Sequence, residues 1–375
     1  MKYRKLRVII SGGGTGGHIF PAISIAGKFK ELNPETEILF VGAKGRMEME
    51  KVPKAGYRIV GLPISGLQRK LSLRNMVHNL ALPFKTLYSR AKARKLIREF
   101  KPDIAVGVGG YASAPLLMAA TRAHIPSIIQ EQNGFAGLTN KMLGGKVDRI
   151  CVAYEGMERF FPAEKIVMSG NPIRSNIGPA TPEMKARALE HYGLDAQRKQ
   201  LLIVGGSLGC GTLNRTLMAW IEAGCPGGED LEILWQCGKY YEQQVAEFMR
   251  GRELPFVHWS AFIERMDLAY AAADLIISRS GASSVSEICA CGKACIFVPS
   301  PNVAEDHQTH NAMALVSKGA AALVRDSDAL QCLMKEAVAL VHDPQRLESM
   351  EKNAAALALP DAARVIVDCA YELVK

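Results

Sequence analysis

The chain has 375 residues, of which 48% are hydrophobic and 22% charged, so it is long enough for two globular domains. No apolar run approaches the ~20 residues that span a bilayer, and the basic N-terminus leads into an apolar stretch too short for a signal peptide. The nine cysteines are odd in number and lack the spacing of a disulfide framework. These properties exclude a membrane-spanning or secreted protein and predict a cytoplasmic one.

The net charge of +9 is distributed unevenly along the chain. Residues 1–173 carry 27 Lys and Arg against 12 Asp and Glu, whereas the remaining residues carry 19 against 25. The first half is therefore basic and the second mildly acidic. We expect the basic half to meet an anionic partner.

In the first half of the chain, apolar strands alternate with helical segments. We predict strands at 7–11, 37–41, 57–62, 104–108, 126–130, 149–153 and, in a shorter form, 165–168. The first helix is expected over 21–32, because Pro21 is a favoured residue in a first turn. This alternation indicates a parallel sheet with helices on both faces.

A glycine-rich turn, Gly12-Gly13-Gly14-Thr15-Gly16-Gly17-His18, follows the first strand. A strand that turns on glycines into a helix leaves bare N–H groups that suit a phosphate or a developing anion. The turn fits the dinucleotide pattern G-x-G-x-x-G, but the second strand ends in Gly42-Ala43-Lys44 without the acidic ribose ligand. An NAD site is therefore disfavoured. His18 is either a structural polar residue or a general base, since its ordinary pKa lies near neutrality.

A basic stretch follows, in which no acidic residue occurs from Leu62 to Arg98. One interpretation is a solvated helix face over a core stripe. The other is a helix lying on an anionic membrane surface, where each cation contributes about 1 kcal/mol. Nucleic acid is disfavoured because no recognised binding module accompanies the cations. We favour the membrane surface, and the cations are Arg69, Lys70, Arg74, Lys85, Arg90, Lys92, Arg94, Lys95 and Arg98.

Two further polar groups follow strands of the first half. Gly109-Gly110-Tyr111 comes after the strand at 104–108, and Gln130-Glu131-Gln132-Asn133-Gly134 comes after the strand that begins at 126. Both lie at the carboxyl edge of the predicted sheet, where ligands bind in such folds. A polar group as dense as 130–133 is hard to explain by packing alone.

The second half repeats the scheme after a boundary near Gly170-Asn171-Pro172-Ile173. We predict strands near 200–204, 231–236, 256–258, 274–278 and 294–298, with a second glycine turn, Gly205-Gly206-Ser207-Leu208-Gly209, after the first of them. The chain is thus expected to form domains of residues 1–173 and 174–360. A last helix over 361–375 is expected to pack back on the first domain. Two such units imply two nucleotide-binding folds that face each other across a cleft.

Two loops of the second half carry candidate ligand groups. Glu287 follows the turn at Ser280-Gly281 and is either a solvated helix residue or a carboxylate that accepts both ribose hydroxyls. Gln308, after Glu305-Asp306-His307, either binds sugar hydroxyls or serves as loop scaffold. The cluster Cys289, Cys291 and Cys295 lacks a second Cys/His pair for a metal, so we interpret these cysteines as small buried hydrophobic residues.

These motifs together resemble the MurG family of peptidoglycan N-acetylglucosaminyltransferases. Seven strings match in family order and cover most of the chain: residues 13–22, 109–111, 131–134, 170–174, 205–209, 279–282 with 286–287, and 307–308 with 311–312. The resemblance implies a GT-B fold, an α/β architecture of two Rossmann-like parallel-sheet domains. It implies inverting transfer of N-acetylglucosamine from UDP-N-acetylglucosamine to undecaprenyl-diphospho-muramoylpentapeptide (lipid I), which gives lipid II.

The resemblance also implies roles for individual residues. The substrate-binding residues for UDP-N-acetylglucosamine would be Thr15, Gly16, Gly17, Asn133, Arg174, Ser207, Ile263, Ala282, Ser283, Ser284, Val285, Ser286, Glu287 and Gln308. Gly13, Gly14, Tyr111 and Glu131 are candidates on the acceptor side. The family often has His where this chain has Gln130, which cannot take a proton, so the role of base passes to His18.

Further expectations follow from the same resemblance. No cofactor or metal is expected, because a helix N-terminus and Arg174 would stabilise the leaving diphosphate. The expected partners are both substrates, anionic inner-leaflet phospholipid and other cell-wall synthesis proteins, at the cytoplasmic face of the inner membrane, with roles in cell shape, division and the cell cycle. The alternatives are another GT-B-type UDP-sugar enzyme, either an epimerase or a glycolipid glycosyltransferase, and a non-enzymatic nucleotide-binding subunit docked on the membrane.

Overall fold

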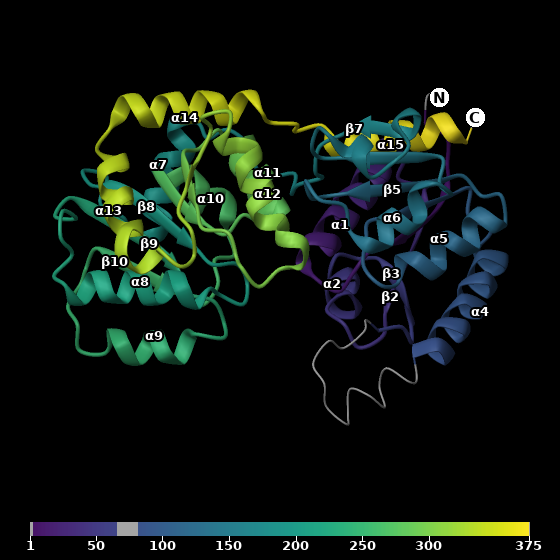
Figure 1. The fold of residues 1–375 in the computed structure, drawn as a ribbon, viewed down its shortest axis with the longest axis horizontal. Coiled ribbons are helices and arrows are strands. Elements are labelled where there is room, and N and C mark those ends of the chain that lie inside the picture. The colour runs from purple at the N-terminus through teal and green to yellow at the C-terminus, as the bar shows by residue number, and fades with distance from the viewer. Residues whose placement is uncertain (1–2, 66–81, 375) are drawn as a thin grey trace. The chain divides into compact units, whose positions relative to one another are not determined.

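The computed structural model describes residues 3–65 and 82–374 of the chain, which divide into two compact units (Figure 1). Unit 1 comprises Met1–Arg174 and Leu359–Lys375, and unit 2 comprises Ser175–Ala358. Each unit holds one parallel sheet, so the predicted α/β class with two parallel-sheet domains is confirmed. The predicted basic residues Arg69, Lys70 and Arg74 lie outside the described residues.

The sheet of unit 1 has seven strands in the order β3-β2-β1-β4-β5-β6-β7, and every neighbouring pair is parallel. The order changes direction at β1, which pairs with β2 on one side and β4 on the other. Ligands bind beyond the carboxyl ends of the strands at such a point. The strands are β1 (Arg7–Ser11), β2 (Glu37–Ala43), β3 (Arg58–Leu62), β4 (Ile104–Gly107), β5 (Ser127–Glu131), β6 (Arg149–Val152) and β7 (Ile166–Met168).

Helices cover both faces of this sheet. The helices of unit 1 are α1 (Gly16–Leu32), α2 (Glu48–Lys54), α4 (Leu82–Phe100), α5 (Ser113–Arg122), α6 (Leu138–Gly144) and α15 (Ala362–Leu373), with short helical turns at Met157–Arg159 and Ala163–Lys165. Successive strand side chains point to opposite faces, so Val8 and Ile10 pack with α1 and α15, whereas Ile9 packs with α4 and α5. This alternation explains why the central residues of the strands are apolar on both faces of the sheet.

The first helix begins five residues before the predicted start at Pro21. Thr15 is its N-cap, and the N–H groups of His18 and Ile19 both donate to the Thr15 carbonyl at 3.2 Å. Pro21 therefore lies inside the helix and does not open it. The glycines are poor helix formers, which is why the sequence pattern placed the start too late.

The C-terminal helix α15 belongs to unit 1 although it is distant from α1 in sequence. Tyr371 lies in edge contact with Tyr3, at 5.0 Å between ring centroids, and its hydroxyl donates to the Arg4 carbonyl at 2.8 Å. Its ring also packs against Phe29 of α1. The last helix thus closes one face of the unit 1 core.

The sheet of unit 2 has six strands in the order β10-β9-β8-β11-β12-β13, again all parallel. The strands are β8 (Lys199–Val204), β9 (Leu231–Gln236), β10 (Val257–Ser260), β11 (Leu275–Ser278), β12 (Cys295–Phe297) and β13 (Ala322–Leu323). The sequence analysis missed β13, because two residues are too few to show an alternation. The order changes direction at β8, directly before the second glycine turn.

Some of the helices of unit 2 pack around a large apolar cluster that includes Trp235, and the helices over 182–192 and 266–272 share a smaller one. The helices of unit 2 are α7 (Pro182–Tyr192), α8 (Gly211–Glu222), α9 (Glu242–Met249), α10 (Met266–Ala272), α11 (Ala282–Cys291), α12 (His307–Val316), α13 (Ala329–Val341) and α14 (Pro344–Ala356), with a short turn at Ala304–Asp306. The two helices that follow β8 and β11 start at the carboxyl edge of the sheet. Their N-termini face the region where a ligand is expected.

Candidate functional site

The glycine turn of unit 1 is held by a buried carboxylate that the sequence analysis missed. Glu48, at the start of α2, is fully buried, and its Oε2 accepts the Gly14 N–H at 3.0 Å while its Oε1 accepts the Ala43 N–H at 2.9 Å. A Cβ on Gly13 would lie 2.2 Å from Glu48 Oε1. The prediction that this turn presents only bare N–H groups is therefore wrong for Gly14.

His18 lies in the first turn of α1, against the pair Gly109-Gly110 that follows β4. Its Nδ1 is 3.2 Å from the Thr15 hydroxyl oxygen, and its ring is so close to Gly109 that a Cβ there would lie 2.8 Å from Nε2. Gly110 in turn approaches Gly13, whose carbonyl oxygen would be 2.3 Å from a Cβ at residue 110. Tyr111 follows and is 49% exposed. The structure thus brings together Gly13, His18 and 109–111.

The polar group at 130–133 is a buried hydrogen-bond network. Glu131 is 2% exposed, and its carboxylate accepts N–H groups from Asn133, Gly137 and Asn140 at 2.9–3.4 Å. Gln130 donates to Asn171 at 2.9 Å. Packing therefore explains most of this group, contrary to the expectation. Glu131 shapes the loop that carries Asn133, and its own carboxylate is turned inward.

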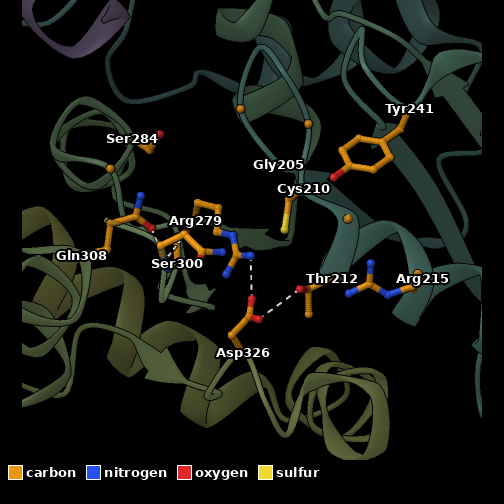
Figure 2. A pocket seen from close by; sticks show the side chains of 15 residues that line it. Gly205, Cys210, Thr212, Arg215, Tyr241, Arg279, Ser284, Ser300, Gln308 and Asp326 are labelled. Atoms are coloured by element: carbon orange, nitrogen blue, oxygen red, sulfur yellow. Dashed lines mark hydrogen bonds and ion pairs between the residues drawn. The ribbon is translucent and has the colours of Figure 1, made fainter. Parts of the chain in front are cut away.

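Unit 2 contains a polar cavity of about 520 Å³ at the carboxyl edge of its sheet (Figure 2). It lies between the glycine turn after β8 and the turns after β11 and β12. The predicted residues that line it are Ser284 and Gln308, with glycines of both turns. Its lining is completed by Cys210, Thr212, Arg215, Tyr241, Arg279, Ser300, Asn302 and Asp326.

A hydrogen-bonded framework fixes the loops around this cavity. Arg279 forms an ion pair with Asp326 at 2.5 Å and donates to the carbonyl groups of Val298 and Pro299 at 2.8 and 2.9 Å. Asp326 also accepts the Thr212 hydroxyl at 3.1 Å, so α8 is joined to the loops after β11, β12 and β13 (Figure 2). The sequence analysis missed this role of Arg279 and Asp326, because four separate segments contribute to it.

Gln308 takes part in the same framework. Its Oε1 accepts the Ser300 N–H at 2.8 Å, and its backbone carbonyl accepts the Ser280 hydroxyl at 2.8 Å. The side-chain amide nitrogen lies on the side nearer Ser284 (Figure 2). Gln308 is thus both loop scaffold and a polar group of the cavity, so the two interpretations left open by the sequence are compatible.

The first turns of α11 contain the predicted stretch from Ala282 through Val285 and Ser286 to Glu287. Glu287 is only 6% exposed and accepts the Tyr270 hydroxyl at 3.1 Å, so the alternative of a solvated helix residue is wrong. The Ser283 hydroxyl oxygen is buried without a hydrogen-bond partner among the described residues. Most buried polar atoms of folded proteins have a hydrogen-bond partner, in the protein, in water or in a ligand.

The remaining predicted residues are placed as follows. Ser207 is exposed at the tip of the glycine turn, and Arg174 is half-buried at the end of the first segment of unit 1. Ile263 is 3% exposed, and its N–H donates to Gln236 Oε1 at 2.9 Å. A ligand contact through that N–H would have to displace Gln236. Thr15 is exposed, and Gly16 and Gly17 lie within α1.

Unit 1 has a second cavity, of about 370 Å³, whose lining is cationic. Lys44, Arg46 and Lys85 line it together with Pro63 and Ile64. Among the residues that the structure describes, no carboxylate is paired with these three cations. This basic surface lies in the half of the chain for which an anionic partner was predicted.

The cysteine cluster of unit 2 is buried, as predicted. Burial raises the pKa of Cys289 to about 12 and that of Cys295 well above its ordinary value. The thiolate is the form that binds a metal, so these side chains are disfavoured as ligands. Within 3–65 and 82–374, no group of three or more His, Cys, Asp or Glu side chains is arranged to hold a metal ion.

Comparison with known proteins decides the family. Residues 8–152 match the glycosyltransferase family 28 N-terminal domain, and residues 200–366 match its C-terminal domain. Two relatives bear the name UDP-N-acetylglucosamine–N-acetylmuramyl-(pentapeptide) pyrophosphoryl-undecaprenol N-acetylglucosamine transferase. The one from Bacteroides fragilis is 52% identical over 99% of this chain and 95% of its own, and the one from Bacteroides thetaiotaomicron is 53% identical over 99% and 98%. The chain belongs to the MurG family.

Solved structures agree with membership of the MurG family. MurG of Acinetobacter baumannii is similar with a TM-score of 0.77 and 28% identity, over 98% of this chain and 100% of that one. A UDP-N-acetylglucosamine 2-epimerase is similar with a TM-score of 0.64 but is only 16% identical over 97% and 95% of the two chains, which shows a common fold alone. The GT-B expectation is thus confirmed for the architecture of the two units.

Proposed function

We propose that this chain transfers N-acetylglucosamine from UDP-N-acetylglucosamine to lipid I, with inversion at the sugar, and so forms lipid II for peptidoglycan synthesis. The observation that carries the proposal is full-length identity of 52–53% to transferases of that printed name. The polar cavity of unit 2, with a glycine turn and a helix N-terminus at its edge, suits a sugar diphosphate.

The uridine part of the donor is assigned to unit 2. Glu287, buried beside Tyr270, would accept the ribose hydroxyls, and the backbone near Ile263 would contact uracil. Ser207 and Arg174 would bind the diphosphate, while Gln308 and Asn133 would bind the sugar. The unpartnered Ser283 hydroxyl supports a ligand at the start of α11.

The acceptor is assigned to unit 1, where His18 would take the proton of the attacking hydroxyl. Gly109 lies against its ring and Gly110 against Gly13, so the segments of the candidates Gly13, Gly14 and Tyr111 adjoin, and Glu131 would act by shaping the loop of Asn133. The departing UDP gains negative charge as the bond to the sugar breaks. Positive helix ends and arginine stabilise that charge without reorganisation, so we expect no requirement for a metal.

A transfer assay tests this proposal directly. The chain is incubated with radiolabelled UDP-N-acetylglucosamine and a short-chain lipid I analogue, and we expect a labelled lipid II analogue whose rate of formation is unchanged by EDTA. Loss of activity in EDTA would overturn metal independence. Turnover of the donor to its 2-epimer without transfer would instead favour an epimerase, and binding of UDP without any reaction would indicate a non-enzymatic subunit.

The membrane surface is assigned to α4. Phe84, Leu87 and Tyr88 are 76%, 61% and 63% exposed on one face, whereas Ala93 and Ile97 are buried against the rest of the unit. These three exposed side chains therefore do not belong to a core stripe. No helix within 3–65 and 82–374 is long and apolar enough to cross a membrane. We place the chain as a peripheral protein at the cytoplasmic face of the inner membrane, where cell-wall synthesis supports cell shape and division.

Vesicle binding checks this surface with a matched pair of variants. Leu87 and Leu330 are each 61% exposed, in units 1 and 2 respectively. We expect Leu87→Ser to weaken binding to phosphatidylglycerol vesicles by about tenfold, because one leucine side chain no longer enters the bilayer. Leu330→Ser should bind like the wild type. Equal binding of all three proteins in a sedimentation assay would exclude α4 from the membrane contact.

A further inference from the structure

The cavity of unit 2 extends beyond the residues to which the family resemblance gave a role. Ser284 and Gln308 lie on one side, and Arg215 and Tyr241 lie on the opposite side, with Arg279 and Asp326 between them (Figure 2). Arg215 comes from the second turn of α8, and Tyr241 precedes α9. Neither Arg215 nor Tyr241 is among the residues to which the family resemblance assigns the donor.

The tips of Arg215 and Tyr241 converge over the first residue of α8. A Cβ on Gly211 would lie 2.7 Å from the Tyr241 hydroxyl oxygen and 3.0 Å from Arg215 Nη1. Gly211 thus leaves room for two polar groups at the N-terminus of a helix of twelve residues. A guanidinium, a phenolic hydroxyl and backbone N–H groups at one place form a set of donors that matches a phosphate.

Arg215 is also the cation of this cavity that is open to a ligand. The guanidinium of Arg279 is occupied by Asp326 and by two backbone carbonyl groups. For Arg215, by contrast, no ion pair or hydrogen bond exists with any residue of 3–65 and 82–374. An arginine held near a polar cavity without a carboxylate is suited to an anionic ligand.

The composition of the cavity indicates which part of the donor meets Arg215. The lining includes Gln308, which is assigned to the sugar, and the glycine turn after β8, but it includes neither Ile263 nor Glu287, which are assigned to the uridine. The cavity therefore corresponds to the sugar and diphosphate half of the nucleotide. The phosphate in that half, distal to the ribose, is the one bonded to the sugar.

We propose that Arg215, assisted by the Tyr241 hydroxyl, binds the distal phosphate of the sugar nucleotide. This inference rests on the proposed function and adds a second cation to the donor site. Negative charge grows on that phosphate as the bond from its oxygen to the sugar carbon breaks. Arg215 would consequently bind the transition state more tightly than the ground state and would act on kcat as well as on donor affinity.

Binding of uridine nucleotides tests the assignment without any acceptor. Calorimetric titrations with UDP and UMP are compared for the wild type, Arg215→Met and the control Arg187→Met, an exposed arginine of α7. We expect Arg215→Met to lower the affinity for UDP by ~10–100-fold, which is the range of a charge-assisted hydrogen bond. The affinity for UMP should stay within about twofold of the wild-type value. Arg187→Met should bind both nucleotides like the wild type, and Arg215→Lys should recover part of the UDP affinity.

A second variant, at Gly211, displaces the Arg215 guanidinium and the Tyr241 hydroxyl without removing either side chain. Gly211→Ala puts a methyl group where the Arg215 and Tyr241 tips meet, so we expect lower UDP affinity with unchanged UMP affinity and an unchanged or higher melting temperature. The assignment would be overturned if a variant lost equal affinity for UDP and UMP, or if neither Arg215→Met nor Gly211→Ala lost affinity for UDP. The proposed function would remain intact in both cases. A wild-type chain that binds no uridine nucleotide would instead overturn the proposed function, and the inference with it.

Discussion

Replacing His18 with alanine is expected to lower kcat for transfer to a lipid I analogue by ~10²–10⁴-fold, the usual contribution of a general base. The affinity for UDP should change much less, because the polar cavity proposed for the diphosphate lies in unit 2, whereas His18 belongs to unit 1. The imidazole is oriented by the Thr15 hydroxyl at 3.2 Å from Nδ1, and Nε2 lies against Gly109. These two contacts fix the orientation of the imidazole ring beside Gly109.

Two further variants distinguish a base from a structural histidine. Thr15→Val removes the partner of Nδ1 and should reduce kcat by a smaller factor than His18→Ala. His191→Ala, an exposed histidine of unit 2, should leave kcat unchanged. Steady-state kinetics with a thermal melt for each protein provide the measurement. If the His18→Ala protein is folded and turns over at near wild-type kcat, another group must take the proton.

Gly209→Ala should destabilise unit 2 and abolish measurable UDP binding. The residue has φ +87°, and a Cβ there would lie 2.1 Å from the Cys237 carbonyl oxygen, in the backbone that follows β9. The left-handed conformation costs an L-residue about 1–2 kcal/mol, and the collision adds about 1–3 kcal/mol because backbone must move. That is a large part of a typical free energy of unfolding of about 5–15 kcal/mol.

Gly206 is the matched control for this prediction. It lies in the same turn with φ +85°, but a Cβ there would meet no atom within 4 Å. Gly206→Ala should therefore lower the free energy of unfolding by the conformational cost alone, about 1–2 kcal/mol. Urea denaturation followed by circular dichroism gives both values. Equal destabilisation by the two substitutions would show that the close approach of Gly209 to Cys237 does not matter.

The strands were largely predictable, whereas the ends of the elements were less so. The predicted strands 7–11 and 231–236 coincide with β1 and β9, because the central residues of a strand buried on both faces are mostly apolar. The start of α1 was misplaced at Pro21, since local propensity disfavours a helix through Gly16 and Gly17. The two-residue strand β13 left no pattern at all.

Among the site residues, motif strings found those that are close together in sequence. Gly13, His18 and Tyr111 were singled out, and the structure places their segments in contact. Glu48 was not, because nothing in Met47-Glu48-Met49 differs from an ordinary helix start. Only the fold brings its carboxylate to the N–H of Gly14, 34 residues away in sequence.

By itself the amino-acid sequence determined the α/β class, the two glycine turns and the family, because strands, turns and motif strings are written in neighbouring residues. The tertiary structure alone decided that Glu131 and Glu287 are buried, and that Arg279 is paired with Asp326 while Arg215 has no ion pair within 3–65 and 82–374. The physical reason is that burial and ion pairing depend on which distant segments meet. The ion pair of Arg279 joins β11 to a residue 47 positions later, a distance over which no local pattern acts.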